Sequence, residues 1–161
     1  MRGSIIVGLV MALGLSSATL AYDDPKQLVQ AIYQPYQTGQ QHADLGQFYS
    51  SRLKQLFAGQ GAKAAAEVDT SGPVAVEAIV DFNPFIDAKH ALLLDVDIGE
   101  PIVVGDSALV TIGFHNFDQP TLISLSLVRE AEGWKVDDVS SMGGEHNWML
   151  SWLLQYDPWS M

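Results

Sequence analysis

The chain has 161 residues, and its 8 Lys and Arg against 19 Asp and Glu give a formal net charge of −11. A chain this acidic repels nucleic-acid phosphates and anionic lipid surfaces, so neither is expected as a partner, whereas a cationic protein would be attracted. The sequence contains no cysteine, so the fold has no disulfides, and its length suits one domain with a single hydrophobic core.

The first 21 residues have the order of a secretory signal peptide. Arg2 precedes an apolar run over residues 5–15, and small residues follow up to Ala21. The run is shorter than the roughly 20 residues of a membrane span. We expect cleavage after Ala21, a single domain over residues 22–161, no membrane span after cleavage, and a periplasmic or secreted protein. A permanent N-terminal anchor is the alternative, and lipid attachment is excluded because no cysteine follows the run.

Helical patterns occupy the next part of the chain. Asp24 and Pro25 have the pattern of an N-cap followed by a first helical residue, and Pro35 and Gly39 are expected to kink or end this helix. One face of this first helix carries apolar side chains at Leu28, Val29, Ile32, Tyr33 and Tyr36. A second, short helix is predicted over residues 43–49.

A further helix is predicted to begin at Ser50 or Ser51 and to bury Leu53 and Phe57. The segment 59–72 combines an alanine run with glycines. The alanines favour helix and the glycines favour a break, so we expect an extension of this helix that ends in a loop.

The pattern changes to strands after residue 90. In the segment 109–117, Val110, Ile112 and Phe114 alternate with a second face that includes His115. A short turn before residues 133–139 predicts an antiparallel hairpin with the preceding strand. The final segment resembles a helix with a stripe at Trp148, Met149, Trp152, Leu153 and Tyr156.

Helices followed by a run of antiparallel strands predict an α+β fold. We expect N-terminal helices packed on a curved antiparallel sheet of four to five strands, with a C-terminal helix. This order, together with the closing strand at 133–139, resembles the nuclear transport factor two-like (cystatin-like) cone fold.

The segment 83–90 resembles a mid-chain signature of the secreted and lipoprotein family called domain of unknown function 3828. That signature is Asp-Pro-Phe, two residues, then Ala-Gln-Asp. Pro84, Phe85 and Ala88 match it, Asn83 stands in place of the Asp, and Lys89-His90 replace Gln-Asp. The resemblance covers most of the chain after the signal peptide and implies export, but it carries no established activity.

The polar residues of the segment 81–90 suggest a metal site or a turn. Asp81, Asn83 and Asp87 lack the central glycine and closing Glu of a calcium loop. Asp87 and His90 offer only two ligands to a transition metal. We therefore predict no metal and no other cofactor. The alternative that we favour is a turn capped by Asn83 and anchored in the core by Phe85.

The candidates for acid–base catalysis are His115, Asp81 and Asp138. The cone-fold resemblance implies a pocket in which a His and an Asp can meet, and catalysis requires them within hydrogen-bond reach. His115 shares a strand face with Leu109 and Thr111, so it either points into such a pocket or lies on the surface near the strand end. No nucleophile or phosphate-binding motif is present.

The candidates for ligand or partner binding are Asp87, His90, Trp148, Trp152 and Trp159. A tryptophan stripe at helical spacing commonly belongs to the core, whereas Trp159, beyond the helix, favours a docking surface.

The favoured function is a non-catalytic exported binding module for a cationic protein or a small apolar ligand, which would need a closed pocket of a few hundred cubic ångströms. One alternative is an inhibitor or immunity protein that binds a basic cell-envelope enzyme. The other is a small dehydratase or isomerase that uses His115 and an Asp.

Overall fold

The computed structural model describes residues 21–40, 42, 44–68, 80–144 and 147–156. Residues 1–20 of the predicted signal peptide and the candidate Trp159 lie outside these ranges. The helices are α1 (Pro25–Gln37), the 3-10 turn η1 (Gly46–Phe48), α2 (Ser51–Val68) and α4 (Leu150–Gln155). The strands are β1 (Leu93–Ile98), β2 (Ile102–Val104), β3 (Ser107–Asn116), β4 (Gln119–Glu130), β5 (Gly133–Ser141) and β6 (Trp148–Met149).

Side-chain caps begin the first two long helices, as the sequence predicts. The Asp24 carboxylate accepts hydrogen bonds from the backbone N–H groups of Lys26 at 2.7 Å and Gln27 at 3.1 Å. Ser50 Oγ accepts from the backbone N–H of Leu53 at 3.0 Å. The second helix continues to Val68, so the predicted helical extension is observed, while residues 69–72, where the loop is expected, lie outside the described residues.

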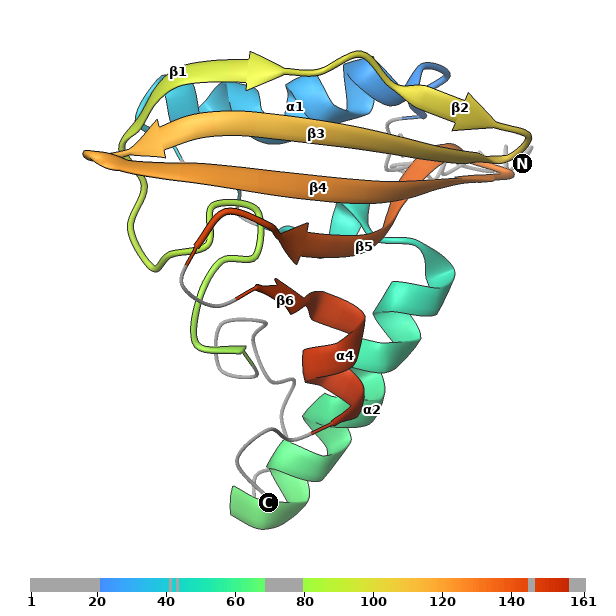
Figure 1. Ribbon diagram of the computed structural model, residues 1–161. Helices are drawn as coiled ribbons and strands as arrows, with labels where there is room; N and C mark the ends of the chain where they lie inside the picture. Colours follow the sequence, from blue (N-terminus) through green and yellow to red (C-terminus); the bar gives the residue numbers. More distant parts are fainter. Residues whose placement is uncertain (1–20, 41, 43, 69–79, 145–146, 157–161) are drawn as a thin grey trace, which may run out of the picture.

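The strands form one antiparallel sheet in the order β1-β3-β4-β5-β6, and β2 pairs with β3 on the same side as β1 (Figure 1). The predicted hairpin is present, because Glu130 pairs with Gly133 across a two-residue turn. The short strands β2 and β6 bring the total to six in the described ranges, against four to five predicted. Strands of two or three residues are too short to show a periodic pattern.

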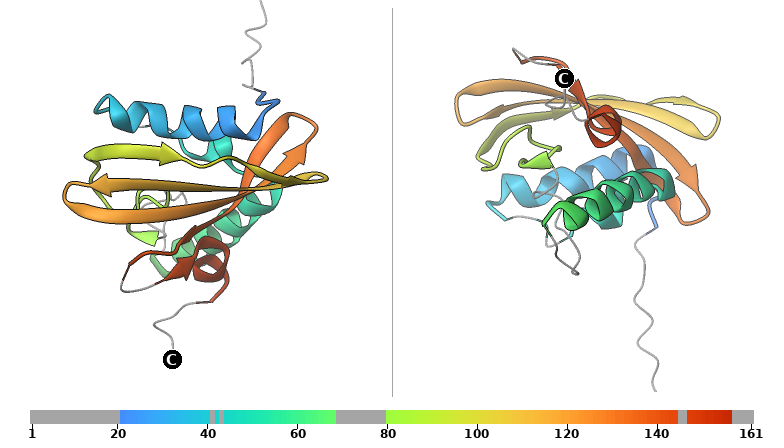
Figure 2. Two further views of the ribbon diagram at one scale, coloured as in Figure 1. Left: turned by 45° about the horizontal axis from the view of Figure 1, so that its top comes forward. Right: turned by 90° about the horizontal axis from the view of Figure 1, so that it is seen from below.

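The core lies between one face of the sheet and the helices. Both α1 and α2 cover the inner face, while α4 lies beside α2 beyond β6 (Figures 1 and 2). Val110 and Ile112 of β3 are fully buried on this face, and His115 belongs to the opposite, exposed face. The predicted α+β architecture with a curved antiparallel sheet is confirmed. None of the helices in the described ranges has the length and apolar character that crossing a bilayer requires.

The C-terminal stripe differs from the prediction. Trp148 and Met149 belong to β6, which pairs with the end of β5, so the helix begins only at Leu150. Its buried residues include Leu150 and Leu154, whereas the side chain of Trp152 is 66% exposed. The expectation that the stripe lies in the core is therefore wrong for Met149, Trp152 and Tyr156, which are exposed, because the helix turns Leu150, Ser151 and Leu154 toward the core instead.

Tyr22, the first residue of the expected mature chain, is tied to the start of β5. It forms a parallel bridge with Gly133, and the backbone N–H of Trp134 donates to the Tyr22 carbonyl at 2.8 Å. Gly133 has a φ of 96°, and a Cβ at this position would lie 2.6 Å from the Tyr22 carbonyl oxygen. Only glycine fits here without displacing the chain.

Gly133→Ala is expected to lower the free energy of unfolding by about 2 kcal/mol, because it adds both left-handed backbone strain and a clash with Tyr22. Urea unfolding of the chain that begins at Tyr22 measures this. Gly59→Ala is the control, since no atom lies near its Cβ and helix propensity should stabilise α2 slightly. Equal stability of Gly133→Ala and the parent would contradict the close packing of Tyr22.

Candidate functional site

The segment 83–88 is a turn held by Asn83. The Asn83 side-chain oxygen accepts from the backbone N–H of Phe85 at 3.0 Å, and its amide nitrogen donates to the Tyr36 hydroxyl at 2.7 Å. The backbone N–H of Asn83 donates to the Ala88 carbonyl at 3.0 Å. Phe85 is completely buried. The predicted capped, core-anchored turn is confirmed.

A buried tyrosine fixes the same turn from the helix side. Tyr33 of α1 donates its hydroxyl proton to the Phe85 carbonyl at 2.7 Å. The hydroxyl lies inside the core, and this burial, followed by the neighbouring Tyr36, raises the pKa of Tyr33 well above its usual 10.0. The turn is therefore bound to α1 by a hydrogen bond that water does not reach.

Asp87 joins the turn to the far end of the sheet. Its carboxylate accepts from Ser141 Oγ at 2.7 Å and from the indole N–H of Trp148 at 2.8 Å. The Phe82 ring packs edge-on against the Trp148 ring, with centroids 5.0 Å apart. The structure thus brings two predicted binding residues, Asp87 and Trp148, into direct contact.

His90 takes a different role in the same region. Its side chain is exposed, while its backbone carbonyl accepts from the Asn116 side-chain amide at 3.0 Å. This bond connects the end of the turn to the end of β3.

Asp138 of β5 caps the start of α4. Its carboxylate accepts from the backbone N–H of Ser151 at 3.0 Å and from the Ser151 hydroxyl, and Arg52 Nη2 lies 3.9 Å from it. These contacts satisfy the start of the short helix. Both oxygens of this catalytic candidate are engaged in holding α4.

The other two catalytic candidates lie on the surface. Asp81 is exposed and forms an ion pair with Lys89 at 2.8 Å. His115 Nδ1 lies 3.6 Å from an Asp95 carboxylate oxygen, with side-chain exposures of 48% and 85%. Neither His115 nor Asp95 is among the residues that line the three hollows described below.

Asp138 lies far from His115 along the sheet. Ser126 pairs with both Leu109 and Asp138, and Leu109 is six residues from His115 on β3, which corresponds to about 20 Å. The His115–Asp95 pair lies at the surface, and this arrangement does not exclude water from a substrate.

The outer face of the sheet carries an apolar hollow of about 360 Å³ near its C-terminal edge. Trp152 of α4 and Met149 of β6 line it together with Trp148, and Met142, which follows β5, completes the apolar wall. Met142, Met149 and Trp152 are 57%, 47% and 66% exposed. The predicted stripe contains Met149 beside the two tryptophans, but only the tryptophans were predicted to bind a partner, and Met142 was not predicted at all.

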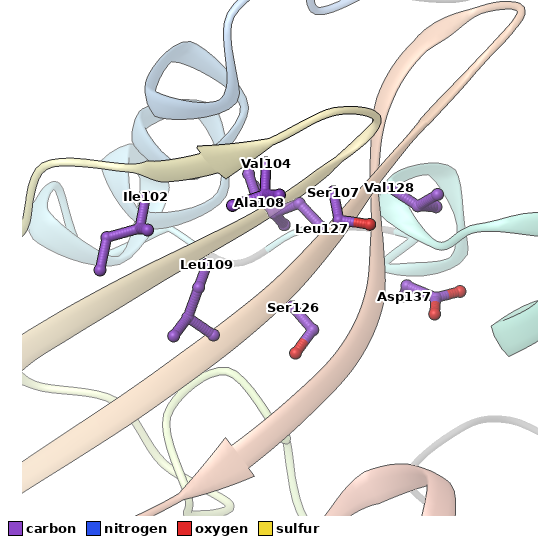
Figure 3. A pocket seen from close by; sticks show the side chains of 9 residues that line it. All are labelled: Ile102, Val104, Ser107, Ala108, Leu109, Ser126, Leu127, Val128 and Asp137. Carbon is purple, nitrogen blue, oxygen red and sulfur yellow. The ribbon is translucent and has the colours of Figure 1, made fainter.

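A second hollow, of about 390 Å³, lies at the opposite corner of the sheet. Side chains from β2, β3 and β4 surround it, with Asp137 of β5 at its rim (Figure 3). Ile102 and Val104 are 66% and 75% exposed. The consecutive apolar residues at 102–104 were a visible signal of this site, but as part of a predicted strand they gave no reason to expect exposure.

The inner side of the sheet is packed by the protein's own side chains. Trp134 and Tyr33 are fully buried there, and Tyr49 and Phe85 pack ring to ring at 5.9 Å. A third hollow, of about 420 Å³, lies between α1 and Ile98 of β1 and is open. The described cavities with apolar linings therefore lie on the outer face of the sheet.

No three His, Asp or Glu side chains in the described ranges converge as metal ligands. No protein-family model matches the chain, and searches of curated proteins and of solved structures find no match either.

The buried Tyr33 hydroxyl predicts a pH dependence of stability. Because the folded-state pKa is raised, the contribution of neutral Tyr33 is complete below the usual value of 10.0 and is lost as the pH rises from there toward the folded pKa. The free energy of unfolding should then fall by up to about 1.4 kcal/mol per pH unit.

Urea unfolding between neutral and strongly alkaline pH measures this slope. Tyr33→Phe should reduce the slope and also lower stability by about 1 kcal/mol at neutral pH through the lost hydrogen bond to Phe85. Tyr156→Phe, at an exposed position, should keep the slope of the parent. An unchanged slope in Tyr33→Phe would show that Tyr33 is not its source.

Proposed function

We propose that the protein is an exported, non-catalytic binding module that docks a cationic protein on the outer face of its sheet. The observation that carries the proposal is the hollow at Met142, Trp148, Met149 and Trp152. Clustered exposed apolar side chains are typical of interaction sites, and tryptophan and methionine are enriched in protein interfaces.

The hollow is built on fixed elements, which favours binding. Trp148 is held by its hydrogen bond to Asp87 and by the Phe82 ring. The helix that carries Trp152 is held by Asp138. Side chains that are already ordered lose less entropy when a partner binds.

The charge of the chain supports a cationic partner. Over residues 91–130 the only Lys or Arg is Arg129, whereas the acids are Asp95, Asp97, Glu100, Asp106, Asp118 and Glu130. Such a surface attracts basic proteins and speeds their association. A basic cell-envelope enzyme has this property, so an inhibitor or immunity protein is one form that the module can take.

A protein partner is favoured over a small apolar ligand because the inner side of the sheet is filled and the apolar hollows are open at the surface. The enzyme alternative has less support, since the His115–Asp95 pair is solvated.

Site-specific photo-crosslinking in the producing cells tests the proposal. A benzoylphenylalanine at position 152 is expected to form one major adduct with a basic protein, and Met149→Ser should reduce that adduct several-fold by removing part of the apolar wall. High salt should slow formation of the adduct.

Position 92 provides the matched control, because Leu92 is a 50% exposed apolar residue next to β1 and lies outside the hollow. A benzoylphenylalanine there should not form the same adduct. Equal labelling at positions 92 and 152, an acidic captured protein, or no adduct at position 152 would each contradict the proposal.

A further inference from the structure

We propose that β2 captures an extended, basic segment of the partner as an additional antiparallel strand. This inference rests on the proposed function and specifies the chemistry of the partner. It is carried by three observations: the exposure of β2, its hydrogen-bonding pattern, and the two acidic residues that flank it.

The strand β2 is apolar and exposed on both of its faces. Ile102 and Val104 point to the outer face, as their β3 partners Leu109 and Ser107 do. Val103 pairs with the buried Ala108 and so points to the inner face, yet it is 50% exposed. The strand therefore extends past the cover that the helices give. Proteins commonly protect such edges, because an uncovered apolar edge pairs with other chains.

The free edge of β2 carries the backbone groups of Val103. Val104 and Ser107 flank the two-residue turn formed by Gly105 and Asp106. In such a hairpin the residues that flank the turn exchange hydrogen bonds, and the next residue of each strand directs its N–H and C=O away from the partner strand. The Val103 N–H and C=O thus point away from β3, toward the position that an added strand would occupy.

The turn and the neighbouring pairing agree with this alternation. Gly105 has a φ of 59°, as a tight hairpin turn requires. Further along β3, the Thr111 carbonyl accepts from Gly99 on the same side at 2.9 Å. Thr111, Leu109 and Ser107 are separated by steps of two, so all three direct their backbone groups toward the β1–β2 side.

The flanking charges select against a second copy of this chain. Antiparallel self-pairing about Val103 places each residue opposite the one at the same distance on the other side. Glu100 of each copy would then lie near the Gly105–Asp106 turn of the other copy, and like charges held close together destabilise strand pairing. Both residues are exposed, and Glu100 has one cationic neighbour, Lys26.

The same geometry defines the segment that fits. The central residue of the partner segment is the one that lies opposite Val103. A Lys or Arg three residues before it would lie near Asp106, and one three residues after it would lie near Glu100. Apolar residues directly before and directly after the central one would lie opposite Val104 and Ile102, at the hollow of about 390 Å³. The expected pattern is basic, any, apolar, any, apolar, any, basic. Main-chain hydrogen bonds provide the affinity of such strand addition, and side chains provide the selectivity.

The test uses the blocked peptide Lys-Thr-Val-Thr-Val-Thr-Lys and the chain that begins at Tyr22. In an NMR titration, the peptide is expected to shift the Val103 amide signal and to slow its hydrogen exchange. A peptide with Glu at both ends, and one N-methylated at the central Thr, should each bind at least about tenfold more weakly.

Val103→Pro is the sharpest variant, since its N–H faces the free edge and no ladder bond is lost. It should weaken peptide binding about tenfold or more, whereas Val103→Ala, which keeps the N–H, should stay within about threefold. Glu100→Lys combined with Asp106→Lys keeps the edge backbone and should reverse the preference between the Lys and Glu peptides.

The outcomes separate this inference from the proposed function. Unchanged binding by Val103→Pro or by the N-methylated peptide would overturn strand addition, while the adduct at position 152 would still stand. If the adduct at position 152 is lost while Val103-dependent peptide binding remains, the hollow at Met142, Trp148, Met149 and Trp152 has no part in the function. Slow exchange of the Val103 amide that grows with protein concentration and needs no peptide would overturn the choice of a basic partner. Absence of peptide binding would overturn the inference.

Discussion

The carboxylate of Asp87 is the contact that ties the polar turn to the C-terminal edge of the sheet. It accepts hydrogen bonds from Ser141 at the end of β5 and from Trp148 in β6, so one side chain joins the turn at 83–88 to two strands. The hydrogen bond from the Tyr33 hydroxyl fixes the same turn to α1. A half-buried indole N–H without an acceptor would be costly, and the position of Trp148 therefore follows from this carboxylate.

The two faces of the sheet have separate roles. The inner face is used to build the core, where Trp134 and Phe85 fill the space between the sheet and the helices. The outer face bears no covering layer in the described part of the chain, except where α4 lies at its edge. Any recognition by this protein is therefore expected on a surface whose shape is set by a rigid core beneath it.

The sequence predicts those elements whose signals are local. Asp24-Pro25 and the alternation around Val110 and Ile112 each need only their neighbours, and both are observed. The start of α4 depends on Asp138, thirteen residues before Ser151, which no local pattern shows. The polar turn shows the same limit: Asp87 resembles a ligand in sequence, but its hydrogen-bond partners lie more than fifty residues away. Trp148 and Trp152 were identified for the site, whereas Met142 and Ile102 required the pairing of the sheet.

The acids on either side of β2 have a consequence for how the protein behaves in solution. Glu100 and Asp106 act against self-pairing through a repulsion between exposed charges, and salt screens such a repulsion over about 8 Å at physiological ionic strength. The protection of this edge is thus conditional on the medium. At low salt the charge keeps copies apart, and as salt rises the apolar strand retains its attraction while the repulsion fades. In a concentrated compartment of high ionic strength, the strand Ile102–Val104 would then pair with other copies of the chain as well as with a basic segment.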